Sequence, residues 1–246
     1  MSDSEMIVNL HPVVVRLSEG VSIWNADCRD IMDPDMRVDA VVTDPPYGIG
    51  FAAQPTKWQR RAGMTPKDWD NGSAKVDWLL SLSELVVIWG GNYFPLPPSR
   101  GWLSWFKPDA PPSMGSFELA WTNIDQNPRQ ISQSIGATNA ERLGHPTQKP
   151  LRVMEWTLEQ AGIPKGATVF DPFMGVGTTG AACIRTGRKF IGIERDPEYF
   201  AKARKRLERE LSQIQSTFDF GGGASAPTHN VSVHRRRTLC AVRCDA

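Results

Sequence analysis

Cysteine and long apolar runs are scarce in this sequence, and each scarcity excludes a class of protein. The 246 residues include four cysteines, too few for a disulfide scaffold. No signal-like apolar segment opens the sequence, so we expect a reducing, cytoplasmic setting. The longest strongly apolar stretches, such as residues 85–89, are far shorter than the roughly 18–20 residues that a membrane span needs. We therefore expect a protein that neither relies on disulfides nor crosses a membrane.

A net charge of one sign is also lacking, because 28 Lys and Arg residues are balanced by 27 Asp and Glu residues. The charges are unevenly distributed along the chain. Residues 1–50 hold nine acids and three bases, whereas residues 202–246 hold nine bases and four acids. A polyanion would therefore have to meet a local basic surface rather than a uniformly positive protein.

Short apolar runs alternate with amphipathic stretches, which predicts an α/β fold with a doubly wound, mostly parallel sheet. The length favours one large domain. Apolar residues at steps of three and four predict a helix from Leu151 to Ala161, between Pro150 and Gly162, and another over 200–214. The expected strands are residues 21–25, 40–43, 85–89, 168–171 and 189–194.

Two stretches, residues 52–84 and 95–142, lack this periodicity and are rich in Pro, Trp, Gly and polar residues. They interleave aromatic residues with bases, among them Lys57, Arg60 and Arg61, a combination suited to stacking on bases and contacting phosphates. The alternative is that their tryptophans anchor irregular loops in the core. We expect both stretches to be irregular insertions.

The chain from residue 221 onward has the composition of a linker and predicts a disordered tail over 221–246. This tail carries the only metal-like spacing in the sequence, His229, His234, Cys240 and Cys244. Because apolar periodicity is lacking there, we predict no metal site.

The strongest local pattern is VDAVVTDPPYGIGF at residues 38–51, where a buried strand leads into Asp44, Pro45, Pro46 and Tyr47. Open α/β sheets bind ligands at such strand ends. The exocyclic amine of adenine or cytosine is a poor nucleophile, because its lone pair is delocalised into the ring. Asp44 and the Pro45 carbonyl can each accept one N–H, which points the lone pair at an electrophile. Pro46 stiffens the loop, and Tyr47 offers a ring to a flipped base. Asp-Pro-Pro is otherwise a good turn starter.

A second pattern, ATVFDPFMGVGTTGAACIRTG, occupies residues 167–187. Gly175, Gly177 and Gly180 lie between a strand and a helix, and Glu194 follows 19 positions after Gly175. This spacing also fits a dinucleotide fingerprint, in which the helix start binds pyrophosphate and the acid binds a ribose.

The acids at the strand ends argue against a pyrophosphate. Asp171 ends one strand and Asp44 ends another, so the crevice between them would be acidic. Such a crevice favours a cofactor with an ammonium and a sulfonium group. S-adenosylmethionine carries both, with a ribose diol for Glu194 and a carboxylate for the helix start at Thr178 and Thr179.

The pair of motifs, DPPY at 44–47 and FMGVG at 173–177, resembles the hallmark pair of the DNA amino-methyltransferases. The order, with the catalytic loop first and a long segment before the cofactor loop, is similar to that of the circularly permuted beta class. The likeness spans about residues 20–212. It implies the fold of S-adenosylmethionine-dependent methyltransferases, duplex DNA as the partner, and the homodimers often found in that class. No Pro-Cys dipeptide is present, which removes the motif of carbon-5 cytosine methylation.

The resemblance also implies residue roles. NADC at 25–28 resembles the segment that meets the adenine ring of the cofactor. HPTQKP at 145–150 resembles the segment that approaches the methionine end of the cofactor. ERDPEYF at 194–200 resembles the segment whose acid binds the ribose. Asp27 could instead cap a helix, and Lys149 could be a solvated charge. The predicted cofactor-binding residues are Asp27, Cys28, Asp44, His145, Thr147, Lys149, Asp171, Phe173, Gly175, Gly177, Thr178, Thr179 and Glu194.

We therefore predict one methyltransferase domain over residues 1–220, with 52–84 and 95–142 as DNA-recognition loops, that methylates N6 of a flipped adenine. N4 of cytosine is the close alternative, because the same carboxylate and carbonyl could hold that amine. Asp rather than Ser at position 44 favours adenine through the family likeness. An NAD-dependent oxidoreductase would explain the glycines but not DPPY. A protein that only docks on DNA would not need Asp44 and Tyr47.

Overall fold

The computed structural model describes residues 12–31, 33, 35–50, 53, 67–112, 114–145 and 147–219. Within them lie nine strands: β1 (Val13–Ser18), β2 (Val21–Asn25), β3 (Ala40–Thr43), β4 (Val86–Trp89), β5 (Trp102–Phe106), β6 (Phe117–Thr122), β7 (Arg129–Ser132), β8 (Thr168–Asp171) and β9 (Lys189–Glu194). They form one sheet in the order β1-β2-β9-β8-β3-β4-β6-β5-β7. The run from β2 to β4 is parallel, as is the pair β5 and β7, whereas β1 and β6 pair antiparallel with their neighbours.

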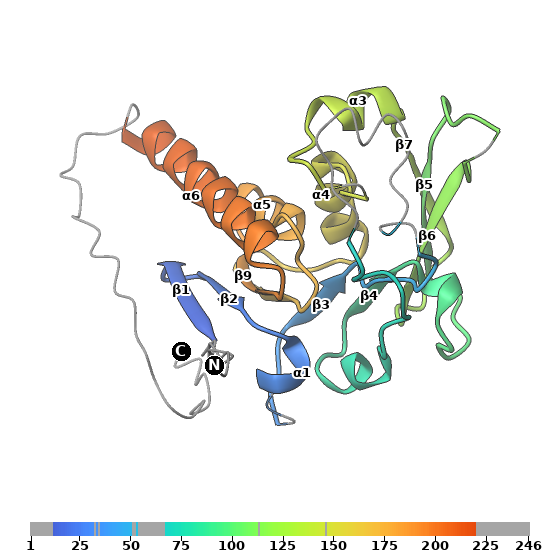
Figure 1. Cartoon of the computed structure of the whole chain (residues 1–246), viewed down its shortest axis with the longest axis horizontal. Coiled ribbons are helices and arrows are strands. Elements are labelled where there is room, and N and C mark those ends of the chain that lie inside the picture. The colour runs from blue at the N-terminus through green and yellow to red at the C-terminus, as the bar shows by residue number, and fades with distance from the viewer. Residues whose placement is uncertain are drawn as a thin grey trace, which may run out of the picture.

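Helices cover both faces of this sheet (Figure 1). They are α1 (Cys28–Ile31), α3 (Ile135–Ala140), α4 (Leu151–Gln160), α5 (Thr178–Arg185) and α6 (Pro197–Asp219), with the 3-10 turns η1 (Asp77–Ser81) and η2 (Gly91–Tyr93). Val42 belongs to the core on the side of α4, α5 and α6, whereas its neighbour Val41 packs on the side of α1 and η1. Successive strand residues point to opposite faces, so β3 is buried on both.

The expected fold class is confirmed. Four predicted strands have the bounds of β2, β3, β8 and β9, and β4 begins one residue later than predicted. Helix α4 follows Pro150 as its N-cap and is followed by Gly162 at a φ of 66°, as the sequence pattern predicts. Among the described residues no helix combines the length and apolarity needed to span a bilayer.

The expectation of an irregular insertion over 95–142 is wrong, because this segment contains β5, β6, β7 and α3. Two of its tryptophans, Trp105 and Trp121, are each 3% exposed and pack in the core. Their indole nitrogens donate to the backbone carbonyls of Gln133 and Pro97. The tryptophans taken as a sign of loops are thus strand residues that fix the antiparallel edge of the sheet.

Several sequence predictions lie outside the described residues. These are the tail over 221–246, with its His and Cys residues, and the proposed DNA contacts Lys57, Arg60 and Arg61.

Candidate active site

The carboxyl ends of five adjacent parallel strands, β2, β9, β8, β3 and β4, open into one cavity of about 1170 Å³. Such strand ends are the ordinary ligand site of open α/β sheets. Every residue of the predicted catalytic and cofactor-binding sets lines this cavity except Gly177. Gly177 instead precedes α5 at a φ of 77°, and a Cβ there would lie 3.1 Å from Ala203, so it allows α5 and α6 to approach closely.

The loop after β3 is clamped from both sides. Residues 70–74 hold it on one side, since the N–H of Ala74 donates to the Pro46 carbonyl at 3.1 Å and the N–H of Gly48 donates to the Asp70 carboxylate at 2.9 Å. On the other side Gly90 follows β4 at a φ of 69°, and a Cβ there would fall 2.0 Å from the Tyr47 ring. Only glycine permits this approach, which fixes where Tyr47 lies.

The Tyr47 ring does not stand alone at the mouth of the cavity. Tyr93 stacks on it, with ring centroids 4.8 Å apart and planes 11° from parallel, so one face of Tyr47 is covered by protein. Four of the five large apolar side chains exposed among the described residues line this cavity: Ile49, Tyr93, Met114 and Phe117. The mouth therefore presents an apolar, partly aromatic surface, which the sequence patterns did not reveal.

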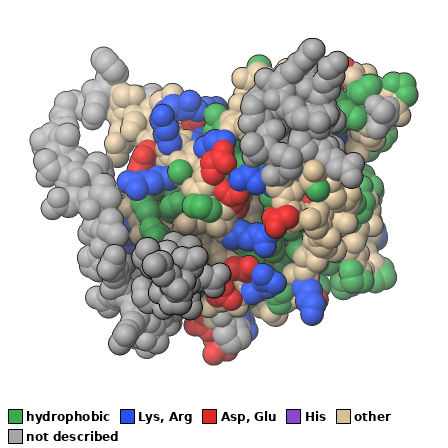
Figure 2. Space-filling model, in the orientation of Figure 1, with side chains coloured by type: hydrophobic (Ala, Val, Ile, Leu, Met, Phe, Trp, Pro, Cys, Tyr) green, Lys and Arg blue, Asp and Glu red, His purple; other side chains and the backbone are tan. Residues whose placement is uncertain are grey.

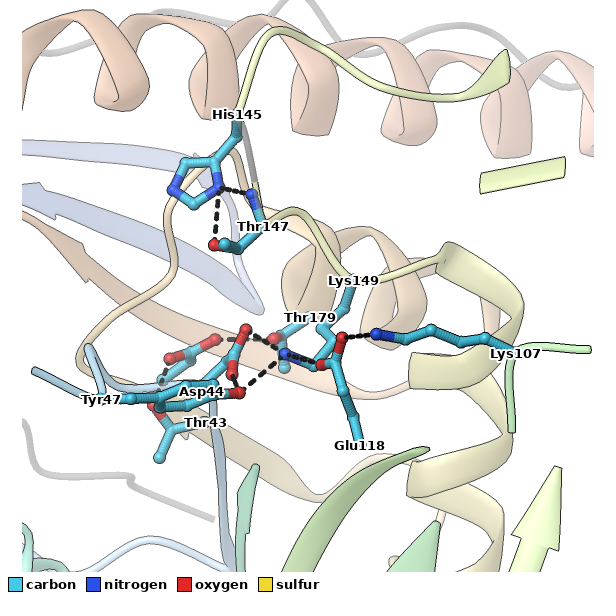
Figure 3. A network of polar contacts seen from close by, with 10 residues as sticks. Thr43, Asp44, Tyr47, Lys107, Glu118, His145, Thr147, Lys149 and Thr179 are labelled. Atoms are coloured by element: carbon cyan, nitrogen blue, oxygen red, sulfur yellow. Dashed lines mark hydrogen bonds and ion pairs between the residues drawn. The ribbon is translucent and has the colours of Figure 1, made fainter. Parts of the chain in front are cut away.

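Asp44 lies at the centre of a charged cluster (Figure 3). Lys149 Nζ donates to Asp44 Oδ2 at 2.6 Å, and the Tyr47 hydroxyl donates to Oδ1 at 2.6 Å. Lys149 also donates to the Tyr47 oxygen at 3.0 Å and lies 2.9 Å from a carboxylate oxygen of Glu118 on β6. Lys107, directly after β5, donates to the other Glu118 oxygen. Lys149 is 4% exposed and is therefore not the solvated charge considered from the sequence.

Burial and opposite charges shift the pKa values of the groups in this cluster in different directions. Burial raises the pKa of Asp44, against the opposing charge of Lys149. Burial alone would lower the pKa of Lys149, but Asp44 and Glu118 raise it well above its usual value. Burial alone would raise the pKa of Glu118, but Lys149 and Lys107 lower it to about 2. Two ammonium groups thus balance two carboxylates next to the DPPY loop.

Asp171 is held from three directions. Its Oδ1 accepts from the Thr43 hydroxyl at 2.7 Å and from the Phe173 N–H at 3.0 Å, and its Oδ2 accepts from the Thr179 hydroxyl at 2.6 Å. Burial raises the pKa of Asp171 from 3.8 to about 6. The side chain therefore joins β3, the glycine loop and α5, in addition to lining the cavity.

Glu194 ends β9 and supports the glycine loop. One carboxylate oxygen accepts from the Gly175 N–H at 3.0 Å and the other from the Asp196 N–H at 2.7 Å. Burial raises the pKa of Glu194 from 4.5 to about 7. The two backbone donors fix the plane of the carboxylate and leave acceptor sites on both oxygens toward the cavity.

Three further predicted cofactor-binding residues, Asp27, Cys28 and Thr178, also line the cavity. Asp27 caps the short helix α1 by accepting from the Arg29 N–H at 3.0 Å, and it also pairs with the Arg29 side chain. Cys28 is 5% exposed, and burial raises the pKa of its thiol to about 11, so it lines the cavity as a small apolar group. The Thr178 hydroxyl accepts from buried Arg206 at 2.9 Å and is thus bound within the protein.

His145 is held by aromatic packing. Its ring stacks on Trp69 at 5.3 Å and leans on Tyr199 at 4.6 Å. Burial and the nearby cations lower its pKa to about 3, so the imidazole is neutral. Its Nδ1 lies 3.4 Å from both the N–H and the hydroxyl of Thr147. His145 and Thr147 therefore form the wall of the cavity next to the glycine loop, since a Cβ on Gly175 would lie 3.6 Å from His145 Nε2.

Comparison with known proteins supports the expected family. A family model described as a DNA methylase, of the N6/N4 type, matches residues 74–205. Among curated proteins, the type II methyltransferase M2.DpnII of Streptococcus pneumoniae is 51% identical over 69 residues, which are 27% of this chain and 24% of that protein. M2.LlaDCHI of Lactococcus lactis subsp. cremoris is 46% identical over 65 residues, 26% of this chain and 24% of that protein. The matches thus span about a quarter of these first relatives.

Solved structures agree with the fold. The crystal structure of an M1.HpyAVI–SAM complex, where SAM is S-adenosylmethionine, superposes with a TM-score of 0.52 at 25% identity, over 76% of this chain and 98% of that one. The cytosine-N4-specific PvuII DNA methyltransferase has a TM-score of 0.51 at 21% identity, over 83% and 94% of the two chains, and shares the fold. With more than half of its length matched by the family model, the chain belongs to the N6/N4 DNA methylase family.

Proposed function

We propose that this protein transfers a methyl group from S-adenosylmethionine to N6 of an adenine flipped out of duplex DNA. One observation carries the proposal. Asp44 and Pro45 follow β3 and line the same cavity as the glycine loop after β8 and Glu194 at the end of β9. Because β3, β8 and β9 are adjacent, an amine acceptor and a cofactor site lie side by side.

The residues present fit S-adenosylmethionine. Gly175 has a φ of 52°, so the loop turns without a side chain on the cavity side. Asp171 and Glu194 give this end an acidic character suited to ammonium and sulfonium groups, and the Glu194 oxygens suit a ribose diol. When bound, the cofactor supplies an electrophilic methyl group.

The protein's part in the reaction is to orient the amine. Asp44 accepts one N–H and the Pro45 carbonyl accepts the other, which turns the nitrogen lone pair toward the methyl group. Between described residues, no hydrogen bond ends on the Pro45 carbonyl oxygen. The rings of Tyr47 and Tyr93 offer stacking surface for the base at the mouth of the cavity. As the nitrogen gains the methyl group it loses one proton, which the Asp44 carboxylate accepts. The rate gain comes from orientation and from charges that are already in place.

The choice of adenine rests on Asp at position 44. Methylating duplex DNA with the purified protein and digesting it to nucleosides for mass spectrometry tests this choice. We expect N6-methyladenine. N4-methylcytosine would keep the mechanism and change the base, and the absence of both products would reject the function.

The pH dependence of cofactor binding tests the role of Glu194. Only the ionised carboxylate accepts hydrogen bonds from the ribose with both oxygens, so affinity should fall as pH drops through about 7, the pKa of Glu194. Replacement Glu194→Gln places an amide N–H₂ against a backbone donor and should weaken binding by roughly 1–3 kcal/mol. Calorimetric titration of S-adenosylmethionine from pH 5.5 to 8.5 is the measurement, those limits being about 1.5 units either side of the pKa.

The variant should also lose the pH dependence of the wild type. A Glu194→Gln protein that binds the cofactor with unchanged affinity and unchanged pH profile would contradict the assignment. Tighter binding of NAD than of S-adenosylmethionine would reject the cofactor altogether.

Duplex DNA is the proposed partner. On the face shown in Figure 2, acidic and basic side chains are interspersed rather than gathered by sign. The proposed phosphate contacts Lys57, Arg60 and Arg61 remain predictions from the sequence. The same holds for a homodimer and for the single domain over 1–220.

A further inference from the structure

Two members of the Asp44 cluster have no role in the reaction as described so far: Glu118 and Lys107. The Glu118 carboxylate bridges two ammonium groups, since one oxygen accepts from Lys107 and the other lies 2.9 Å from Lys149 Nζ (Figure 3). Lys149 also donates to Asp44 and to the Tyr47 oxygen. Lys149 thus has three oxygen partners, as many as an ammonium group has donors.

We propose that Glu118 is a positioning residue for methyl transfer, which fixes the Lys149 ammonium so that Asp44 and Tyr47 keep the one orientation in which Asp44 can accept the target amine. The proposal rests on the proposed function and deepens it. Glu118 acts through Lys149 and need not touch the base.

The first argument concerns rigidity. Asp44, Tyr47, Lys149 and Lys107 all lie on connecting segments, whereas Glu118 lies within a strand. Strand β6 is paired on both sides, with β4 and with β5, and Glu118 is directly opposite Trp105. The β5 ladder holds Glu118 itself, and the β4 ladder holds the same strand from Ala120 onward, so Glu118 is a fixed reference for the loops around it, as precise sites require.

The second argument concerns charge. A lysine ammonium is a compact charge on a flexible stem, so a single carboxylate would not determine where it lies. Without Glu118, the Lys149 ammonium would keep Asp44 as its only carboxylate partner and the Tyr47 oxygen as its second partner, and would compete more strongly with the target amine for the Asp44 oxygens. Glu118 draws one N–H of Lys149 away from Asp44, and Lys107 balances the second negative charge. Lys107 is itself fixed, with its Nζ 4.7 Å from the centre of the Trp105 ring.

Buried ion pairs of this kind contribute orientation more than net stability, because desolvation offsets much of the attraction. The two lysines of the cluster are buried, at 4% and 7% exposed, whereas the Asp44 and Glu118 side chains are 22% and 26% exposed and line the cavity. Retaining two buried lysines and a partly buried glutamate beside Asp44 is therefore better explained by a requirement of the reaction than by folding alone.

The test is the pH profile of single-turnover methyl transfer at saturating cofactor and DNA. The charged or titratable groups that face Asp44 are Lys149, Tyr47, Glu118 and Asp171. The charge of Glu118 raises the pKa of Asp44, and that of Lys149 lowers it. Because only ionised Asp44 accepts the amine, Glu118→Gln should shift the acid limb to lower pH and Lys149→Gln should shift it to higher pH.

We expect Glu118→Gln to lower the plateau rate by about tenfold or more, because the residues that orient Asp44 would be held less firmly. The affinity for S-adenosylmethionine should be unchanged. The matched control is Glu210→Gln, which removes another buried carboxylate, 2.7 Å from Arg185 and on α6. It should lower stability without moving the pH profile. If Glu118→Gln fails to fold, Lys107→Gln takes its place in the test. This variant removes the partner of one Glu118 oxygen and should also lower the plateau rate.

A second arm does not depend on activity. Urea unfolding of Glu118→Gln, Lys149→Gln and the double variant forms a double-mutant cycle, in which contacting residues give non-additive effects. Additive effects would overturn the contact and with it the proposal. Coupling with an unchanged rate and unchanged acid limb in Glu118→Gln would also overturn it, by reducing the cluster to a structural one. If the wild type methylates no base, the proposed function fails, and the role of Glu118 in the reaction is rejected with it. The double-mutant cycle would still decide whether Glu118 and Lys149 interact.

Discussion

Alanine at position 44 should abolish methyl transfer almost completely while leaving the fold intact. Removing a preorganised group that acts mainly in the transition state costs roughly 10²–10³-fold or more in rate. Asp44→Asn should retain a little activity, since its amide oxygen still accepts one hydrogen bond. Its N–H₂ group, however, would oppose a donor from Lys149 or Tyr47, which now reach both carboxylate oxygens. The measurement is single-turnover transfer of labelled methyl groups to duplex DNA.

DNA affinity, measured in parallel, separates chemistry from binding. It should fall far less than the rate, because an interaction made mainly in the transition state affects turnover more than ground-state binding. Thermal melting checks that the variants fold, as expected for a loop at a strand end. Near-normal N6-methyladenine from Asp44→Ala would reject the catalytic assignment.

The second large effect is on stability, at Asp171. Asp171→Ala leaves the Thr43 and Thr179 hydroxyls and the Phe173 N–H without their acceptor, in a place that is 1% exposed. Each lost hydrogen bond to a charged group costs about 1.5–3 kcal/mol, so the free energy of unfolding should fall by roughly 3 kcal/mol or more. Urea unfolding at pH 7 measures it.

Asp171→Asn is the matched control, because its amide keeps the shape and one acceptor. The folded-state pKa of Asp171 is raised from 3.8 to about 6, so the folded protein binds this proton more tightly than the unfolded chain does. Stability from this group is therefore greatest at low pH and declines as pH rises from about 4 to 6. The free energy of unfolding of the Asn variant should not show that decline. It should therefore be closest to the wild-type value at pH 7, where the wild type has lost this stability. Equal loss in Ala and Asn at every pH would contradict this account.

The sequence was sufficient for the parallel half of the fold, because its signals are local. Strands β3 and β8 are short apolar runs that end at an acid, and their side chains are buried on both faces. The same runs place Asp44 and Asp171 at one edge of the sheet, so the core of the candidate site follows from topology alone. The glycines around α5 were recognised by spacing, although Gly177 proves to serve helix packing.

The antiparallel half could not be predicted in the same way. Tryptophan and proline mask the alternation of β5 and β6, so 95–142 looked like loops. Glu118 and Lys107 were missed with it, and so was the binding of Lys149 to Asp44, 105 positions away. The available signal was one acid in the apolar run FELAWT, since a glutamate is rarely buried unless it is paired. Tyr93 was missed because its contact with Tyr47 depends on the turn after β4.

The pairing of β3 with β8 also constrains how the protein is made. Thr43 and Asp171, which join these strands, are 128 positions apart, and the intervening chain forms the rest of the sheet's far side. During synthesis β3 leaves the ribosome long before β8 exists, so its apolar edge must wait for a partner that arrives late. Contacts of such long sequence separation form slowly, and unpaired strand edges invite aggregation in the meantime. A nascent chain that ends before Thr168 thus displays the DPPY loop without β8 beside it, and the candidate site is complete only when β8 has paired with β3.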